Sequence, residues 1–282
     1  MSFDQIDEFI AAGLREDVGT GDVTCLACIP GSARNRARLL VKDEGVLAGM
    51  VIAERIFKTV DPSTRFEKMI DDGANIKYGD VAFIVECHTQ ALLQAERLVL
   101  NTMQRMSGIA TISRQYRDAV ADLPVKILDT RKTTPLIRFL EKWAVRIGGC
   151  HNYRDGLYDW FMIKDNHTDA CGGIQPAIER VHTYQQANGL KLNVTVEVRN
   201  LAELQQVLDT GNVTRIMLDN FQLETMYEAV KMVGKRFETE ASGGVTLDTL
   251  RAIALTGVDY ISVGALTHSA QSLDLSLKVL KD

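Results

Sequence analysis

The stretch VKILDTRKTTP, residues 125–135, is a short apolar run that ends abruptly in charged and hydroxyl side chains. Similar apolar runs recur along the rest of the chain, at 160–163, 192–198, 215–218, 237–241 and 260–263. Helical stretches separate most of them, at 136–147, 174–187, 201–208, 223–233 and 247–255. Because strands that alternate with helices form right-handed βαβ units, this rhythm predicts a parallel sheet. Six such runs favour a TIM-like barrel, complete or incomplete.

The chain before about residue 120 has a different pattern. Helices are predicted at 3–14, at 51–60 and from 91 to about 121, where Ser107-Gly108 is expected to kink or interrupt the long helix. Strands are predicted at 37–41, 45–48, 65–70 and 81–87. This mixture predicts an α+β domain ahead of the barrel.

Composition narrows the function classes. The chain has 282 residues, 46% of them hydrophobic, and no apolar run near the roughly 20 residues that cross a bilayer. Its net charge of −5 argues against general attraction to nucleic acid. The N-terminal segment is acidic and amphipathic, unlike a secretory signal. We therefore expect a cytoplasmic protein that binds neither nucleic acid nor membrane.

The cysteines indicate reduced thiols, because they are odd in number and sparse: Cys25, Cys28, Cys87, Cys150 and Cys171. Cys25 and Cys28 form a single CxxC, with no second Cys or Cys/His pair nearby. Small buried thiols are therefore favoured over a zinc site or a redox pair.

Polar side chains follow every apolar run of the predicted barrel. They are DTRKT at 129–133, KDNH at 164–167, Glu197 and Arg199, Asp219-Asn220, EASGG at 240–244 and Gly264-Ala265. In α/β barrels the active site lies at the carboxyl ends of the strands, so these groups are expected to converge on one rim.

The rim divides by charge. Its cationic side suits a polyanionic substrate and has four members: Arg131, Lys132, Arg154 and Lys164. Glu197 and Asp219 form the acidic side, which could bind Mg²⁺ or stabilise a sugar carbon that becomes cationic. The glycine-rich turns SGG at 242–244 and SVGA at 262–265 let backbone N–H groups approach an anion, and the last two strands of TIM barrels commonly hold a phosphate.

Other interpretations of single residues stay open at this point. Arg131 and Lys132 could pair with surface acids, and Asp165 could cap a helix. Lys164 could be the Schiff-base nucleophile of an aldolase-like barrel. The histidines at 151, 167 and 182 are too scattered for a metal triad.

The ordered motifs resemble those of the quinolinate phosphoribosyltransferases, also called nicotinate-nucleotide pyrophosphorylases (carboxylating). The resemblance runs almost end to end, through EDVGTGDVT at 16–24, AERLVLNTMQRMSGIAT at 95–111, LDTRKTTP at 128–135, EKWAVRIGGCHNYRDGL at 141–157, IKDNH at 163–167, VEVRN at 196–200, IMLDN at 216–220, EASGGV at 240–245 and SVGALTHSA at 262–270. It implies an N-terminal α/β sandwich domain at 1–115, with 271–282 packing against it, and an open α/β barrel of about seven strands at 116–270. It also implies a homodimer, or a hexamer assembled from dimers, in which Arg97 reaches the neighbouring active site.

The implied enzyme is a pentosyltransferase of NAD biosynthesis. It transfers the phosphoribosyl group of phosphoribosyl pyrophosphate to quinolinate with Mg²⁺, and gives nicotinate mononucleotide, pyrophosphate and carbon dioxide. Lys132, Lys164, Glu197 and Asp219 would be catalytic, and Glu197 and Asp219 would also bind the metal. Substrate contacts would come from Arg97, Arg131, Lys132, Tyr153, Arg154, Lys164, Glu197, Asp219, Ser242, Gly243, Gly244, Gly264 and His268.

Three positions depart from the family pattern. Tyr153 stands where the family usually has histidine, Leu136 where glycine is common, and Cys150 ends a usual Gly-Gly-Gly. Tyrosine can donate a hydrogen bond to a carboxylate but carries no positive charge. We expect Tyr153→His to preserve or improve activity.

Three alternatives remain. One is a paralogue with another acceptor, such as the one associated with molybdenum transport, although the intact DTRKT and KDNH motifs favour quinolinate. Another is the Schiff-base barrel that uses Lys164. The third is a carrier-like module in the hairpin at 73–87, which lacks a suitably placed lysine.

Overall fold

The computed structural model describes residues 3–280, which fold into two compact units. Unit 1 consists of residues up to 114, residues 134–149 and the chain from 269 onward, and unit 2 consists of residues 115–133 and 150–268. The expected barrel domain, 116–270, included residues 134–149. By compactness alone, that segment groups with unit 1.

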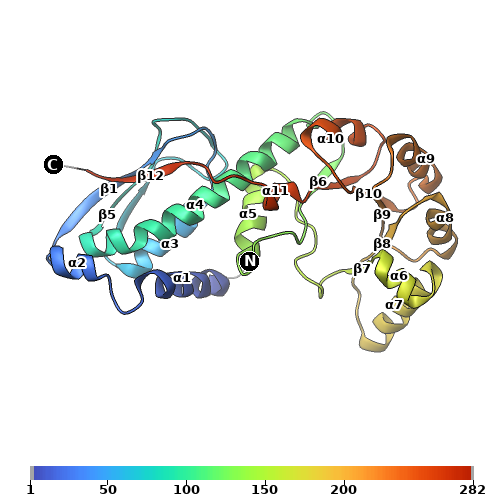
Figure 1. Cartoon of the computed structure of the whole chain (residues 1–282), viewed down its shortest axis with the longest axis horizontal. Helices are drawn as coiled ribbons and strands as arrows, with labels where there is room; N and C mark the ends of the chain where they lie inside the picture. Colours follow the sequence, from blue (N-terminus) through green and yellow to red (C-terminus); the bar gives the residue numbers. More distant parts are fainter. Residues whose placement is uncertain (1–2, 281–282) are drawn as a thin grey trace. The chain divides into compact units, whose positions relative to one another are not determined.

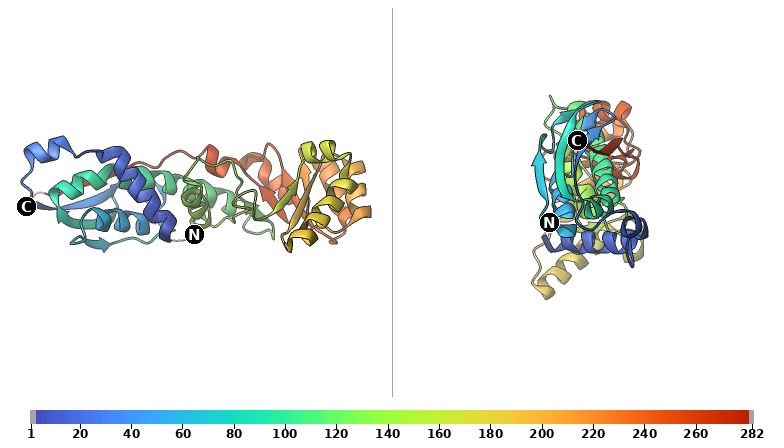
Figure 2. Two further views of the ribbon diagram at one scale, coloured as in Figure 1. Left: turned by 90° about the horizontal axis from the view of Figure 1, so that it is seen from below. Right: turned by 90° about the vertical axis from the view of Figure 1, so that its left-hand side faces the viewer.

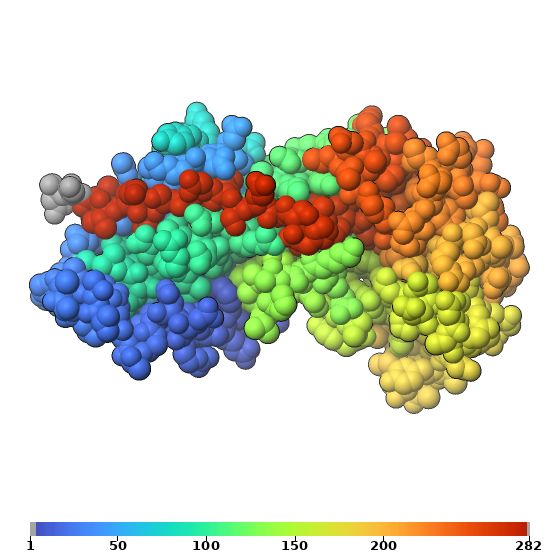
Figure 3. Space-filling model, in the orientation of Figure 1, coloured from blue at the N-terminus to red at the C-terminus, as the bar shows by residue number. Residues whose placement is uncertain are grey.

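Unit 1 is built on a four-stranded antiparallel sheet in the order β12-β1-β5-β3. Its strands are β1 (Arg34–Val41), β3 (Arg65–Lys68), β5 (Val81–His88) and β12 (Leu275–Val279), and a separate small pair joins β2 (Gly45–Val46) to β4 (Asn75–Ile76). Ala37, Leu39 and Val41 of β1 are buried, the alternation of a half-buried strand. The C-terminal strand β12 lies beside β1, along the surface of unit 1 (Figure 3).

Helices α1 (Phe3–Val18), α2 (Val23–Cys28), α3 (Met50–Val60) and α4 (Thr89–Asp118) accompany this sheet (Figure 1). Phe57 of α3 packs edge-on against Phe83 of β5, with ring centroids 6.0 Å apart. The helix α4 is continuous, so the predicted interruption at Ser107-Gly108 is wrong. Glycine is required at 108 for a different reason: a Cβ there would lie 1.8 Å from the carbonyl oxygen of Gln271.

Helix α5 (Arg138–Gly148) packs in unit 1 because its buried face meets α4. The carboxylate of Glu141, which is 0% exposed, accepts two hydrogen bonds from Arg105 of α4 at 2.9 and 2.8 Å. It also accepts the Thr134 hydroxyl at 2.8 Å. At the end of α5, a Cβ on Gly148 would lie 2.5 Å from the carbonyl oxygen of Ala110.

Unit 2 contains the predicted parallel sheet, whose six strands follow the order β6-β11-β10-β9-β8-β7. The strands are β6 (Lys126–Leu128), β7 (Phe161–Ile163), β8 (Val194–Val198), β9 (Arg215–Asp219), β10 (Glu238–Ser242) and β11 (Tyr260–Ser262). Helices α6 (Asp165–Cys171), α7 (Ile174–Asn188), α8 (Leu201–Thr210), α9 (Leu223–Val233) and α10 (Leu247–Ala254) lie on the outer side of this arc, and α11 (Ala265–His268) follows β11 (Figure 2).

One further residue, His151, pairs with the sheet beside β6. His151 forms an isolated parallel bridge with Leu128, through hydrogen bonds from His151 N to Ile127 O at 2.9 Å and from Asp129 N to His151 O at 3.0 Å. This bridge occupies the place of a seventh strand. Between residues 3 and 280 no ladder joins it to β7, so the barrel is open there.

Two sequence predictions concern the rest of the chain. In the described residues no helix is long and apolar enough to span a membrane. All cysteines are free thiols, but only Cys25, Cys87 and Cys150 are buried, whereas Cys28 is exposed. Burial raises the pKa of Cys25 to about 11, which favours an inert thiol over a redox-active one.

Candidate active site

The carboxyl ends of β7 to β10 bring four predicted residues to one rim of unit 2. Lys164 follows β7, Glu197 lies near the end of β8, and Asp219 and Ser242 end β9 and β10. The parallel register places Ser242 directly beside Asp219. The expected convergence at this rim therefore follows from strand pairing alone.

Lys164 and Glu197 form an ion pair at the rim. The Lys164 Nζ lies 2.9 Å from the Glu197 Oε2, and the carboxylate side chain is 7% exposed against 46% for the lysine. A Schiff-base lysine must offer its amine to a substrate carbonyl, whereas the Lys164 Nζ is engaged by the Glu197 carboxylate. The pair therefore argues against the aldolase-like alternative.

Asp219 is a second carboxylate next to Glu197. Burial and the charge of Glu197 raise the pKa of Asp219 above its usual value, and the Asn220 amide opposes them by donating Nδ2–H to Asp219 Oδ2 at 2.8 Å. Two carboxylates that repel each other form a donor set that a divalent cation would stabilise. In residues 3–280 no group of three or more His, Cys, Asp or Glu side chains could hold a metal. Because Mg²⁺ often takes one or two carboxylates with water and phosphate oxygens, Glu197 and Asp219 fit it.

The SGG turn after β10 is held by Asn220. A Cβ on Gly243 would lie 2.2 Å from the Asn220 Oδ1 and 3.1 Å from its backbone nitrogen. Gly243 and Gly244 have φ values of +102° and +58°, which glycine adopts without steric cost. The turn therefore requires both glycines, and Thr246 then caps the start of α10.

Two more groups of predicted residues lie in unit 2. Burial and the nearby charge of Arg131 lower the pKa of Arg154, so these arginines lie close enough to repel each other. A Cβ on Gly264 would come within 2.9 Å of Lys132 Cδ and 3.1 Å of the His268 ring, which places these three residues together. The Lys132 carbonyl accepts the Thr267 hydroxyl at 2.8 Å.

Two residues at the predicted strand ends have other roles. Arg199 turns outward and pairs with Asp169 of α6 at 3.1 Å and Glu203 of α8 at 2.6 Å. Glu240 lies two positions before the end of β10 and is 0% exposed inside the barrel. Neither side chain belongs to the rim.

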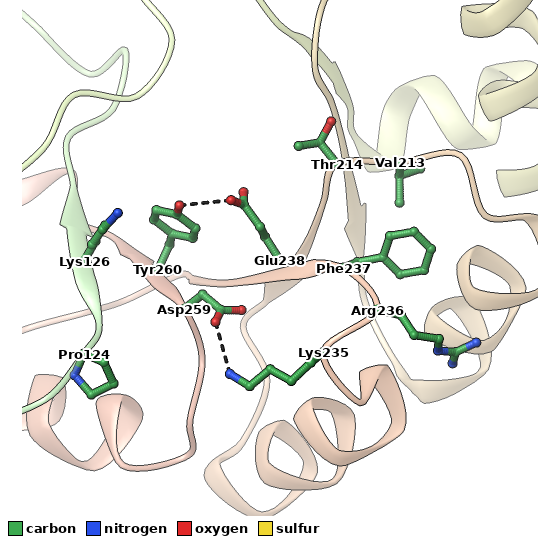
Figure 4. A pocket seen from close by; sticks show the side chains of 10 residues that line it. All are labelled: Pro124, Lys126, Val213, Thr214, Lys235, Arg236, Phe237, Glu238, Asp259 and Tyr260. Atoms are coloured by element: carbon green, nitrogen blue, oxygen red, sulfur yellow. Dashed lines mark hydrogen bonds and ion pairs between the residues drawn. The ribbon is translucent and has the colours of Figure 1, made fainter.

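The cavity in Figure 4 lies at the opposite end of the strands. It has a volume of about 540 Å³ and includes Lys126, Glu238 and Tyr260, the first residues of β6, β10 and β11. Tyr260 donates to Glu238, and Lys235 pairs with Asp259 (Figure 4). A second cavity of about 490 Å³ shares this end.

Sequence and structure comparisons agree on the relatives of this chain. The model of the quinolinate phosphoribosyl transferase N-terminal domain matches residues 22–107, and that of the C-terminal domain matches 109–278. The chain is 47% identical to quinolinate phosphoribosyltransferase [decarboxylating] 1b of Nicotiana tabacum, over 96% of this chain and 81% of that one.

The chain belongs to the quinolinate phosphoribosyltransferase family.

A bacterial relative and a crystal structure extend the likeness. A probable nicotinate-nucleotide pyrophosphorylase [carboxylating] of Bacillus subtilis is 44% identical over 94% of this chain and 90% of its own length. The crystal structure of NadC from Streptococcus pyogenes superposes with a TM-score of 0.93 at 37% identity, over 100% of this chain and 99% of that one. The two-domain fold expected from the family resemblance is thereby confirmed.

Tyr153, the main departure from the family pattern, directs its hydroxyl into the barrel. The hydroxyl lies 2.7 Å from Thr195 Oγ1, with Glu240 close enough to affect its pKa. Burial and the charge of Glu240 raise the pKa of Tyr153, so the phenol stays neutral. The family departure Leu136 is 95% exposed at a φ of +68°, a conformation that glycine would adopt without strain.

Arg97, which the family resemblance assigns to a neighbouring active site, is an exposed residue of α4 in unit 1. Sequence reasoning gave no role to Asp129, although it is 0% exposed and accepts the backbone N–H of Tyr153 at 2.8 Å and the Asn152 amide. A signal was present, since an acid directly after an apolar run often binds nearby backbone donors. Thr195 carried no such signal inside its β-branched strand.

Proposed function

We propose that this protein transfers the phosphoribosyl group of phosphoribosyl pyrophosphate to quinolinate, with loss of carbon dioxide. The observation that carries the proposal is the match of both family domains together with relatives named for this reaction. The rim supports it chemically, because Lys164, Glu197 and Asp219 lie at the ends of the neighbouring strands β7, β8 and β9.

Arg131, Arg154 and Lys132 would bind the two carboxylates of quinolinate and the pyrophosphate. Arg154 is 9% exposed and the charge of Arg131 lowers its pKa, so a bound dianion would relieve repulsion between the two arginines. Guanidinium groups can also bind a carboxylate with two parallel hydrogen bonds. A single carboxylate would relieve less of the repulsion, which favours quinolinate over nicotinate.

Glu197 and Asp219 would hold the ribose hydroxyls and Mg²⁺. When bound, Mg²⁺ would neutralise charge on the departing pyrophosphate. Lys164 holds Glu197 at 2.9 Å and would offer its remaining N–H donors to the pyrophosphate. Both carboxylates would also stabilise positive charge on the sugar carbon as the bond to pyrophosphate lengthens.

The 5′-phosphate would lie at the glycine-rich turns, with contacts from Ser242, Gly243, Gly244, Gly264 and His268. The protein would act in the cytoplasm as a homodimer or hexamer, with Arg97 reaching the partner's site. Decarboxylation would follow ribosyl transfer, because the positively charged pyridinium ring stabilises the electron pair that carbon dioxide leaves behind. A proton then replaces the lost carboxyl group.

The test is an assay of purified protein with quinolinate, phosphoribosyl pyrophosphate and Mg²⁺, in which nicotinate mononucleotide is measured and nicotinate is a parallel acceptor. Product should form from quinolinate alone, stop when EDTA removes the metal, and return with Mg²⁺. Arg154→Met should raise the quinolinate KM by about 10- to 100-fold, the value of a charge-assisted hydrogen bond. The matched control Arg199→Met should retain full activity. Folded protein that forms no product, or that uses nicotinate equally well, would overturn the proposal.

A further inference from the structure

The open side of the barrel is crossed by residues 152–160, which connect the His151 bridge to β7. In a closed barrel, ladder hydrogen bonds would hold both sides of such a gap. Within residues 3–280, the one β-bridge next to this segment is that of His151 with Leu128 of β6. Arg154 lies within this segment, so its position depends on the contacts that fix the segment's other side.

Thr195 of β8 contacts both ends of this segment. Its Oγ1 accepts the Trp160 Nε1–H at 2.9 Å and lies 2.7 Å from the Tyr153 hydroxyl. Thr195 is 0% exposed, and the Tyr153 and Trp160 rings meet edge-on with centroids 5.4 Å apart. One buried hydroxyl on a central strand therefore links both ends of the segment.

The direction of one of these hydrogen bonds is fixed. The Trp160 indole can only donate, so Thr195 Oγ1 accepts from it, while either the Thr195 or the Tyr153 hydroxyl can donate to the other. The buried Glu240 side chain lies near the Tyr153 hydroxyl and raises the pKa of Tyr153. Arg215 Nη1 holds the carboxylate at 3.2 Å, and Ser262 donates to it as well. We call this series, Trp160–Thr195–Tyr153–Glu240, the interior chain.

The interior chain holds the residues on both sides of Arg154. Asp129 binds the backbone N–H of Tyr153 on the side of β6, and Thr195 binds its hydroxyl on the side of β8. Arg154 itself donates Nη1–H to the carbonyl oxygen of Trp160 at 3.3 Å. The guanidinium of Arg154 is thus positioned by Tyr153 and Trp160, which both contact Thr195.

We propose that Thr195 is a positioning residue: through Tyr153 and Trp160 it closes the open side of the barrel with side chains and holds Arg154 where it binds a carboxylate of the acceptor. This inference rests on the proposed function. It also changes one expectation, because a histidine at 153 lacks the hydroxyl that lies 2.7 Å from Thr195 Oγ1. Tyr153→His is now expected to weaken acceptor binding, as Tyr153→Phe would.

The experiment compares Thr195→Val, Thr195→Ser and the matched control Tyr260→Phe. Thr195→Val keeps the shape of the side chain and removes its hydroxyl. The quinolinate KM should therefore rise about tenfold, the effect of losing one hydrogen bond. The KM for phosphoribosyl pyrophosphate should stay unchanged. Thr195→Ser restores the hydroxyl and should return the quinolinate KM to the wild-type value. Tyr260→Phe removes a hydroxyl that donates to Glu238 at 3.1 Å in the same interior, and should leave both KM values unchanged.

Hydrogen-exchange mass spectrometry supplies a measurement that needs no activity. In Thr195→Val, peptides that cover 151–160 should exchange faster, while those from β9 and β10 keep their wild-type rates. Equal rises in both KM values, or unchanged exchange at 151–160, would overturn the inference. If wild-type protein makes no product, the proposed function fails and the exchange measurement alone decides the role of Thr195.

Discussion

Arg215 is the only cation that contacts the carboxylate of Glu240 among the ion pairs of residues 3–280, and we predict that Arg215→Met strongly destabilises the fold. Arg215 Nη1 lies 3.2 Å from Glu240 Oε2, and both side chains are almost completely buried. Nη2 also lies 2.8 Å from Glu238 Oε2, but that side chain is 39% exposed and water would replace the contact. Methionine fills similar volume without charge. The cost is therefore assigned mainly to Glu240 and should be about 3 kcal/mol of unfolding free energy.

The pH dependence of this cost identifies its cause. Burial already raises the pKa of Glu240, while Arg215 lowers it, so removing Arg215 raises the pKa further. An acid whose pKa is higher in the folded than in the unfolded state keeps a proton that the unfolded chain has lost. Stability then falls as pH rises from the unfolded value of about 4.5 through the folded value. The variant should thus lose little stability near the lower limit of this window and the full amount above it.

Urea unfolding, followed by far-UV circular dichroism at about pH 5 and about pH 8, measures both quantities against wild type. Arg251→Met is the matched control, because its pair with Asp122 at 2.8 Å is more than half exposed and solvent screening leaves it little effect on stability. Glu240→Gln added to Arg215→Met should recover about 2 kcal/mol, since no buried charge remains. A loss equal to that of Arg251→Met, or equal at both pH values, would refute the reasoning.

Three further predictions follow from local geometry. Leu136→Gly should raise the unfolding free energy by about 0.5 kcal/mol in thermal melts, because relief of the strain at φ +68° exceeds the entropy that glycine loses; an unchanged or lower midpoint would contradict this. Gly108→Ala should cost about 3 kcal/mol, despite the better helix propensity of alanine, because its Cβ meets the Gln271 carbonyl oxygen; wild-type stability would show that the C-terminal segment moves aside without cost. Asn220→Gly fits the backbone φ of +56° but removes the hydrogen bond that lowers the pKa of Asp219, so the acid limb of the kcat/KM profile should move to higher pH, and an unmoved limb would argue against a role for Asp219.

Strand pairing explains why so much of the rim was predictable. The apolar runs are long enough to specify strands, and their alternation with helices specifies a parallel sheet. Parallel register then brings Lys164, Glu197, Asp219 and Ser242 to one edge without any knowledge of side-chain packing. The family motifs extended this prediction to the roles of single residues, which remain to be tested.

The position of α5 was not predictable in this way. Its amphipathic pattern specifies a helix with one buried face, but periodicity does not say which partner covers that face. The partner is α4, through Arg105 and the close approach of Gly148 to Ala110. Gly108 is a similar case. Glycine is required there because Gln271, far along the chain, leaves no room for a side chain.

The chain by itself determined the strands, their direction and the set of polar groups at their ends, because these depend on residues close together in sequence. Only the tertiary structure decided which charges reach the rim: Glu240 lies inside the barrel, and the Tyr153 hydroxyl turns inward to meet Thr195. Both outcomes depend on side chains from separate strands that meet only after the sheet has curved. Such contacts leave no local pattern, since each residue's partner is distant in sequence and its choice depends on burial and charge together.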